Sequence, residues 1–126
     1  MMGIVFSLLT AFLLSIVGAD VPYTQVERAF AEGDAAKVVS YGKDKILLNV
    51  FEKDGVYASS QATQILKDFF QKNPANTFKF SYKGAVGDGA SAMGNYQAKG
   101  ETYRVTVKWA KISGEYKIES ISILKS

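Results

Sequence analysis

The chain opens with a long apolar stretch and then changes abruptly to polar sequence. Residues 1–19 contain no charged side chain, and Ile4–Val17 is almost wholly apolar, whereas polar sequence begins at Asp20. The apolar run is shorter than the roughly 20 residues that a membrane-spanning helix needs. It ends in the small residues Gly18 and Ala19, a pattern typical of a secretory signal peptide cleaved after Ala19. An uncleaved membrane anchor and a buried core helix are the alternatives.

Apolar residues recur at helical spacing in three later segments. Tyr23–Glu32 is predicted to be a helix with Gly33 as its C-terminal cap, and Asp34–Val39 is predicted to be a second, short helix. The strongest pattern covers Ser59–Lys72, where an apolar stripe lies opposite a polar side. The two serines at the start of this segment are the expected N-terminal caps. We expect the stripe to pack on a sheet, because an amphipathic helix buries its apolar side.

Alternation with a period of two predicts five strands. Lys45–Phe51 is the first, and Lys53–Gly55 is typical of a turn that ends it. From Asn76 onward, four more alternating segments predict an antiparallel meander. In the last of them the apolar positions shift by one residue part-way along the strand. We therefore expect a β-bulge near Glu119–Ser120 that brings the isoleucines on both sides of it onto one face.

The order of these elements indicates an α+β domain. Helices come first and the meander last, which favours helices packed on one face of a curved antiparallel sheet. Residues 20–126 are numerous enough for one domain with its own hydrophobic core. No repeat or second domain is visible in the sequence.

Composition excludes several kinds of active site. The chain has no cysteine, so the fold must depend on hydrophobic packing, and it has no histidine, so neither a Ser–His–Asp triad nor a histidine metal site can form. We therefore predict no catalytic residue, no metal site and no cofactor. The net charge is +3, and 13 of the 15 basic residues are lysines. Because arginine is favoured for contacts with phosphates and bases, nucleic acid is not an expected partner.

A resemblance to a known family is carried by two segments, GVYASSQATQILKDFFQKNP (residues 55–74) and YRVTVKWAKISGEYKIESISI (residues 103–123). The chain resembles an uncharacterised family of small exported bacterial proteins, domain-of-unknown-function family 4783, over essentially all of residues 20–126. That family is similar to the nuclear transport factor 2-like, or cystatin-like, superfamily. Where the family has a serine after the tyrosine of the first segment, this chain has Ala58, which shifts the expected helix cap.

The resemblance implies a cone, in which the helices pack into the concave face of a strongly bent antiparallel sheet. Enzymes of the superfamily use the open end of the cone as a pocket that holds an Asp base, or an Asp–His pair, with a Tyr donor. The pair is ruled out here because the chain has no histidine. An arrangement of one carboxylate and one tyrosine remains open.

Six residues on the predicted strands are candidate ligand contacts, because they combine apolar surface with a polar group or interrupt an apolar pattern. They are Asn49, Tyr82, Tyr96, Tyr103, Trp109 and Glu119. Packing within the core is the alternative role for the aromatic residues, and a solvated or paired carboxylate is the alternative for Glu119.

Alternation also assigns faces within the meander. Phe78, Phe80 and Tyr82 are expected to share one face of its first strand. A basic face that attracts an acidic glycan or lipid head group, or that simply prevents edge pairing, consists of Lys79, Lys83, Arg104 and Lys108. The glycine-rich residues 84–90 are interpreted as a hairpin loop, because no Lys-Ser or Lys-Thr pair follows them.

The leading functional hypothesis is an exported, non-enzymatic domain in the periplasm or at the cell surface. Its expected partners are a small apolar or acidic ligand, or another protein, with homodimerisation through the sheet. No stable membrane insertion is expected once the signal peptide is removed. An isomerase- or lyase-like enzyme that uses a carboxylate and a tyrosine in the cone pocket is the alternative. A lysine-rich surface adhesin that binds acidic polymers is a third hypothesis.

Overall fold

Three helices and one six-stranded sheet make up the part of the chain that the computed structural model describes, residues 20–51 and 53–126. The helices are α2 (Tyr23–Glu32), α3 (Ala35–Ser40) and α4 (Ser59–Lys72). The strands are β1 (Gly42–Val50), β2 (Lys53–Ala58), β3 (Thr77–Val86), β4 (Gly89–Ala98), β5 (Glu101–Ile112) and β6 (Glu115–Lys125). The predicted α+β class and the final four-strand meander are confirmed. The predicted signal peptide, residues 1–19, lies outside the described residues.

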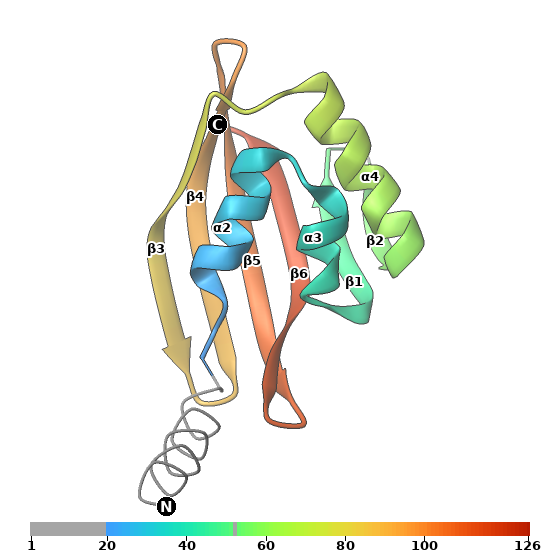
Figure 1. Cartoon of the computed structure of the whole chain (residues 1–126), viewed down its shortest axis with the longest axis vertical. Coiled ribbons are helices and arrows are strands. Elements are labelled where there is room, and N and C mark those ends of the chain that lie inside the picture. The colour runs from blue at the N-terminus through green and yellow to red at the C-terminus, as the bar shows by residue number, and fades with distance from the viewer. Residues whose placement is uncertain (1–19, 52) are drawn as a thin grey trace, which may run out of the picture.

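The sheet has two very different faces. Its strand order is β2-β1-β6-β5-β4-β3, and every neighbouring pair is antiparallel except β1 and β6, which run parallel. All three helices lie on the same side of it (Figure 1). We call the covered side the inner face and the bare side the outer face. None of the helices within the described residues has the length and apolar character needed to cross a membrane.

The helix ends follow local chemistry, with one correction. Gly33 caps α2 with φ +67°, and the Asp34 side chain accepts a hydrogen bond of 3.0 Å from the backbone N–H of Lys37 at the start of α3. The predicted serine caps of α4 are wrong, because Ala58 occupies the cap position. The Ser59 hydroxyl instead donates to the backbone oxygen of Asp44 on β1, at 3.3 Å. This serine therefore joins the helix to the sheet.

Strand β2 corrects the predicted turn at Lys53–Gly55. Lys53 pairs with Val50 and Gly55 pairs with Leu48, so this polar segment is the edge strand of the sheet. The preceding chain reversal involves Phe51, which has φ +55°. The local sequence does not reveal the strand, because Tyr57 is the one large apolar side chain of this edge strand that packs against the core, which leaves little apolar alternation.

A bulge at Ser81 corrects the expected placement of Tyr82. Phe80 pairs with Gly94 and Tyr82 pairs with Met93, so Ser81 is an extra residue in β3. An extra residue reverses the side on which the following side chains lie. Tyr82 consequently points to the outer face and is 54% exposed, whereas Phe80 is buried.

The second bulge was predicted, and the register confirms it. Lys108 pairs with Ser120 and Trp109 pairs with Ile118, which leaves Glu119 as the extra residue of β6. As a result, Ile118 and Ile121 are both buried although an even number of residues separates them. The bulge keeps the apolar side of β6 on the inner face and bends the sheet.

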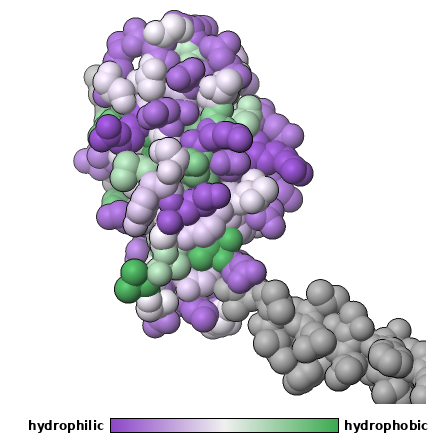
Figure 2. Space-filling view, turned by 90° about the vertical axis from the view of Figure 1, so that its left-hand side faces the viewer, coloured by the Kyte–Doolittle hydropathy of each residue, from purple (hydrophilic) through white to green (hydrophobic). Residues whose placement is uncertain are grey.

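Edge strand β3 is protected by polar groups. The Glu27 carboxylate on α2 accepts a hydrogen bond of 2.7 Å from the backbone N–H of Phe80, beside the bulge. The side of the molecule that carries β3 is largely hydrophilic with scattered apolar patches (Figure 2). Such a surface discourages pairing with strands of other chains.

Close packing in the sheet gives a first prediction. A Cβ atom at Gly94 would lie 2.3 Å from the backbone oxygen of Lys79, whereas at Gly89 its nearest neighbour would be the Val86 oxygen at 3.7 Å. We expect Gly94→Ala to lower the free energy of unfolding by about 2 kcal/mol and the melting temperature by about 10 °C. Gly89→Ala is the matched control and should leave both unchanged. Equal melting temperatures for the two variants would show that β3 and β4 are farther apart at Gly94 than they are in this structure.

Candidate functional site

The interior of the cone is filled with aromatic side chains. Ring contacts with centroid distances of 5.1–6.4 Å connect its two ends. They run in order through Phe51, Phe69, Tyr96, Phe78, Phe80, Trp109 and Tyr23. A hollow of about 280 Å³ remains beside the C-terminal end of α4, next to Phe51, Phe69 and Asn73. Aromatic rings thus occupy the space in which a cone-shaped enzyme would hold its substrate.

Two tyrosine hydroxyls of the interior hold the end of α4. The Tyr96 hydroxyl donates to the backbone oxygen of Asn73 at 2.5 Å, and the Tyr103 hydroxyl donates to its side-chain oxygen at 3.0 Å. Burial, together with the neighbouring Tyr103, raises the pKa of Tyr96 from 10.0 to about 12. Both hydroxyls therefore stabilise the fold. The sequence pattern marked Asn73 only as the end of a helix.

The six candidate residues divide between the two faces. Tyr96, Tyr103 and Trp109 are buried on the inner face, and the Trp109 indole N–H has no hydrogen-bond partner among the described residues. Tyr82 and Glu119 are exposed and Asn49 is half-buried, all three on the outer face. The sheet thus separates Glu119 from Tyr96 and Tyr103, and the structure does not bring a carboxylate and a tyrosine together.

Charged groups are confined to the surface of the described residues. None of residues 20–51 and 53–126 is a buried polar or charged residue. The same part of the chain contains no cluster of three His, Cys, Asp or Glu residues with the geometry to hold a metal ion. Burial raises the pKa of a catalytic carboxylate, and none of the described Asp or Glu residues is buried.

A recess of about 930 Å³ lies on the outer face. It exists because β1 and β6 lose their pairing there. Gly42 pairs with Ile118 and Leu47 pairs with Ser120, so residues 43–46 of β1 lie opposite the single bulge residue Glu119. A Cβ at Gly42 would lie 2.4 Å from Cδ1 of Ile46 and 3.2 Å from the backbone oxygen of Val39, so a larger residue where β1 turns away from β6 would displace the Ile46 side chain.

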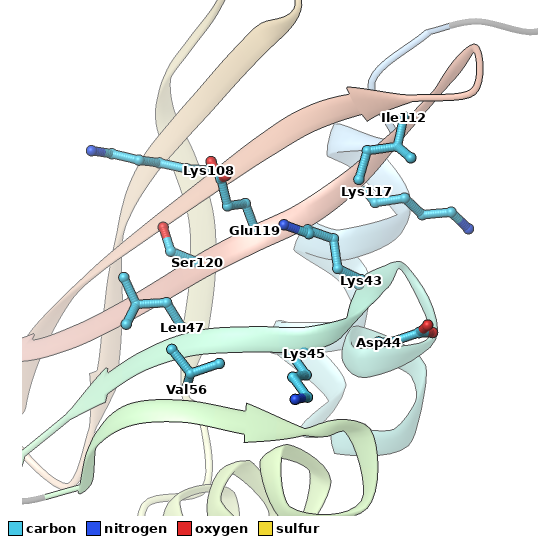
Figure 3. Close-up of a pocket in the computed structure, with 11 residues that line it drawn as sticks. Lys43, Asp44, Lys45, Leu47, Val56, Lys108, Ile112, Lys117, Glu119 and Ser120 are labelled. Atoms are coloured by element: carbon cyan, nitrogen blue, oxygen red, sulfur yellow. The ribbon is translucent and has the colours of Figure 1, made fainter.

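Four lysines line this recess, which we call the lysine groove. Lys43 and Lys45 come from β1, Lys108 from β5 and Lys117 from β6 (Figure 3). Lys117 forms an ion pair of 3.4 Å with Glu115. The groove also contains the carboxylates of Asp44 and Glu119, and the amine of Lys43 points toward Glu119 (Figure 3).

The remaining walls of the lysine groove are apolar or neutral. Leu47 and Val56 are directly paired on β1 and β2, and Ile112 lies on the other wall, near the tip of the β5–β6 hairpin. Asn49 lies two residues beyond Leu47 on β1, where it pairs with Asp54 and Ser122. The groove therefore offers positive charge next to exposed apolar surface.

Sequence reasoning found this groove only in part. Glu119 and Lys108 were candidates, but Lys43, Lys45 and Lys117 were not. The alternation of Lys43, Lys45 and Leu47 was a usable signal, because residues two apart lie on one face of a strand. What was missing was the parallel pairing of β1 with β6, which joins the two walls.

A family comparison identifies the chain. The model of the domain of unknown function DUF4783 matches residues 23–123. The chain belongs to the DUF4783 family. No protein of curated function matches it significantly.

Solved DUF4783 structures have the same fold. The structure matches a family protein from Bacteroides uniformis with a TM-score of 0.79 and 24% identity, over 85% of this chain and 98% of that chain. A family protein from Bacteroides ovatus gives the same TM-score and identity, over 84% and 96% of the two chains. An NTF2-like protein of unknown function from Shewanella baltica matches with a TM-score of 0.60 and 12% identity, over 82% and 86%. The NTF2-like architecture expected from sequence is confirmed for this DUF4783 chain.

The hydroxyl contacts of the interior give a second prediction. Near neutral pH, Tyr96→Phe should lower the free energy of unfolding by about 1–2 kcal/mol, because the backbone oxygen of Asn73 loses its donor. The raised pKa means that the folded state holds the Tyr96 proton more tightly than the unfolded state. The contribution of the Tyr96 hydroxyl to the free energy of unfolding of the wild type is therefore fully present below pH 10. It is lost as the pH rises toward 12.

The gap in stability between wild type and Tyr96→Phe should accordingly narrow as the pH rises through this window. Urea unfolding near neutral pH and at about pH 11 measures it. Tyr82→Phe, at an exposed ring, is the control and should unfold like wild type. A gap that is the same at both pH values would contradict the raised pKa.

Proposed function

We propose that this protein is an exported, non-enzymatic binding domain that holds an acidic ligand in the lysine groove. Export rests on the uncharged, apolar residues 1–19. The absence of enzymatic activity rests on the filled cone and on the separation of Glu119 from the buried tyrosines. The observation that supports the binding function is that four lysines from three strands line one recess.

Charge favours an acidic ligand over a second copy of the chain at this groove. Four lysines against Asp44, Glu119 and the Glu115 that pairs with Lys117 leave the recess with one excess positive charge. Two copies that met through it would bring their lysines close to each other, which costs electrostatic free energy. A ligand with two or more negative charges would instead gain from lysines on both walls, and the recess would shield the contact partly from solvent.

Removal of the β1 lysines is the direct test. We expect Lys43→Ala/Lys45→Ala to weaken binding of tripolyphosphate about tenfold at low salt, because half of the groove's lysines are lost. Isothermal titration calorimetry measures the change. Added salt should weaken wild-type binding as well, since exposed charges are screened.

The matched control removes two lysines that lie outside the groove. Lys79→Ala/Lys99→Ala changes the net charge by the same amount at exposed positions on β3 and in the β4–β5 turn. This variant should bind tripolyphosphate within about twofold of wild type. Equal weakening in both double variants would mean that net charge alone attracts the probe, and would remove the groove as a site.

Glu119 tests the proposed charge arrangement of the lysine groove. Its carboxylate lies in the groove among the lysines, so it repels an acidic ligand. We expect Glu119→Gln to tighten tripolyphosphate binding about threefold, because one negative charge leaves the recess. The same titration measures this change. Weaker binding in Glu119→Gln would show that the carboxylate helps to hold the ligand and would contradict the proposed charge arrangement.

A further inference from the structure

The exposed apolar residues of the lysine groove narrow the class of ligand. Leu47, Val56 and Ile112 are 47%, 64% and 41% exposed, and all three line the recess. Leu47 and Val56 are cross-strand partners, so their side chains form one continuous apolar surface. A ligand that carried charge alone would leave this surface in water, at a free-energy cost that a mixed ligand avoids.

One end of the groove carries most of its apolar surface, although Lys108 lies beside that end and Ile112 lies near Lys117 (Figure 3). Leu47 and Val56 lie together at one end, next to Ser120, whereas Lys43, Lys45 and Lys117 lie toward the other end (Figure 3). Lys43 directs its amine into the groove (Figure 3), so an acidic head group bound there would direct an attached chain toward Leu47 and Val56. The alkyl stems of the lysines extend the apolar wall, since lysine buries its methylenes and exposes its amine.

We propose that the ligand of the lysine groove is a single-chain anionic amphiphile, an alkyl chain with an acidic head group. This inference rests on the proposed function, because it assigns the head group to the same lysines. The recess holds about 930 Å³, within the range of about 300–1,000 Å³ of small-molecule sites and far more than one phosphate fills. The ligand is a free molecule rather than a bilayer, because one head group and one chain match the single recess formed by Leu47, Val56 and the lysines.

A homologous series of alkyl phosphates tests the chain contact. Octyl, decyl and dodecyl phosphate are titrated calorimetrically, each below its micelle-forming concentration. Each added methylene that reaches apolar surface should tighten binding about fourfold, so two carbons should tighten it about fifteenfold. A dodecyl chain on a trimethylammonium head should not bind, because its charge has the wrong sign for the lysines.

Variants of the apolar pair locate the contact. Leu47→Thr/Val56→Thr places threonine, a residue that favours strands, at both positions and should flatten the dependence on chain length, while tripolyphosphate binds as in wild type. Leu124→Thr changes a residue that is 45% exposed and lies outside the groove. It should keep the full dependence on chain length.

Three other outcomes would overturn the inference, and the measurements tell them apart. Affinities independent of chain length, with tripolyphosphate still bound through Lys43 and Lys45, would refute the amphiphile and leave the acidic ligand. No binding of any alkyl phosphate or of tripolyphosphate would refute the inference and the proposed function together. Lysine-dependent binding to vesicles of phosphatidylglycerol, without binding of the monomeric phosphates, would overturn the inference in favour of a bilayer surface.

Discussion

The continuous packing of aromatic rings between the helices and the sheet is the interaction on which the rest of this structure depends. Phe30 and Phe70 bring α2 and α4 into contact with each other and, through Phe78 and Tyr96, with the sheet. With no cysteine in the chain, no disulfide supplements this packing. Large rings bury more apolar surface than any other side chains, and they also leave little room for a guest.

The filled interior and the site on the outer face meet at the bulge of β6. An extra residue at Glu119 allows Ile118 and Ile121 to face the interior together. The pairing of β6 with β1 is interrupted at the same place, where residues 43–46 of β1 have no partner on β6, and the resulting gap is the lysine groove. The bulge residue Glu119 therefore also lines the recess on the opposite face. In this DUF4783 domain the bulge is as important for the surface as for the packing.

The predictions succeeded where the physical cause was local. The helix at Ser59–Lys72 follows from a 3.6-residue period within one segment, and the bulge near Glu119 follows from a phase slip within one strand. They failed where a neighbour decided the outcome. Strand β2 forms because β1 offers it a partner, and Tyr82 changes face because Ser81 is left unpaired against β4. A sequence pattern shows only how apolar residues are spaced, and neither the pairing of β2 with β1 nor the bulge at Ser81 changes that spacing.

By itself the sequence determined the α+β class, the limits of most elements and the absence of histidine and cysteine chemistry, because these depend on residue type and on spacing within short segments. Only the tertiary structure decided which candidates meet. It buried Tyr96 and Tyr103 against Asn73, and it joined the β1 lysines to those of β5 and β6. Those lysines lie far apart in the sequence and share a groove only because β1 pairs in parallel with β6. Such long-range strand pairing is set by the packing of the whole core, which no local pattern encodes.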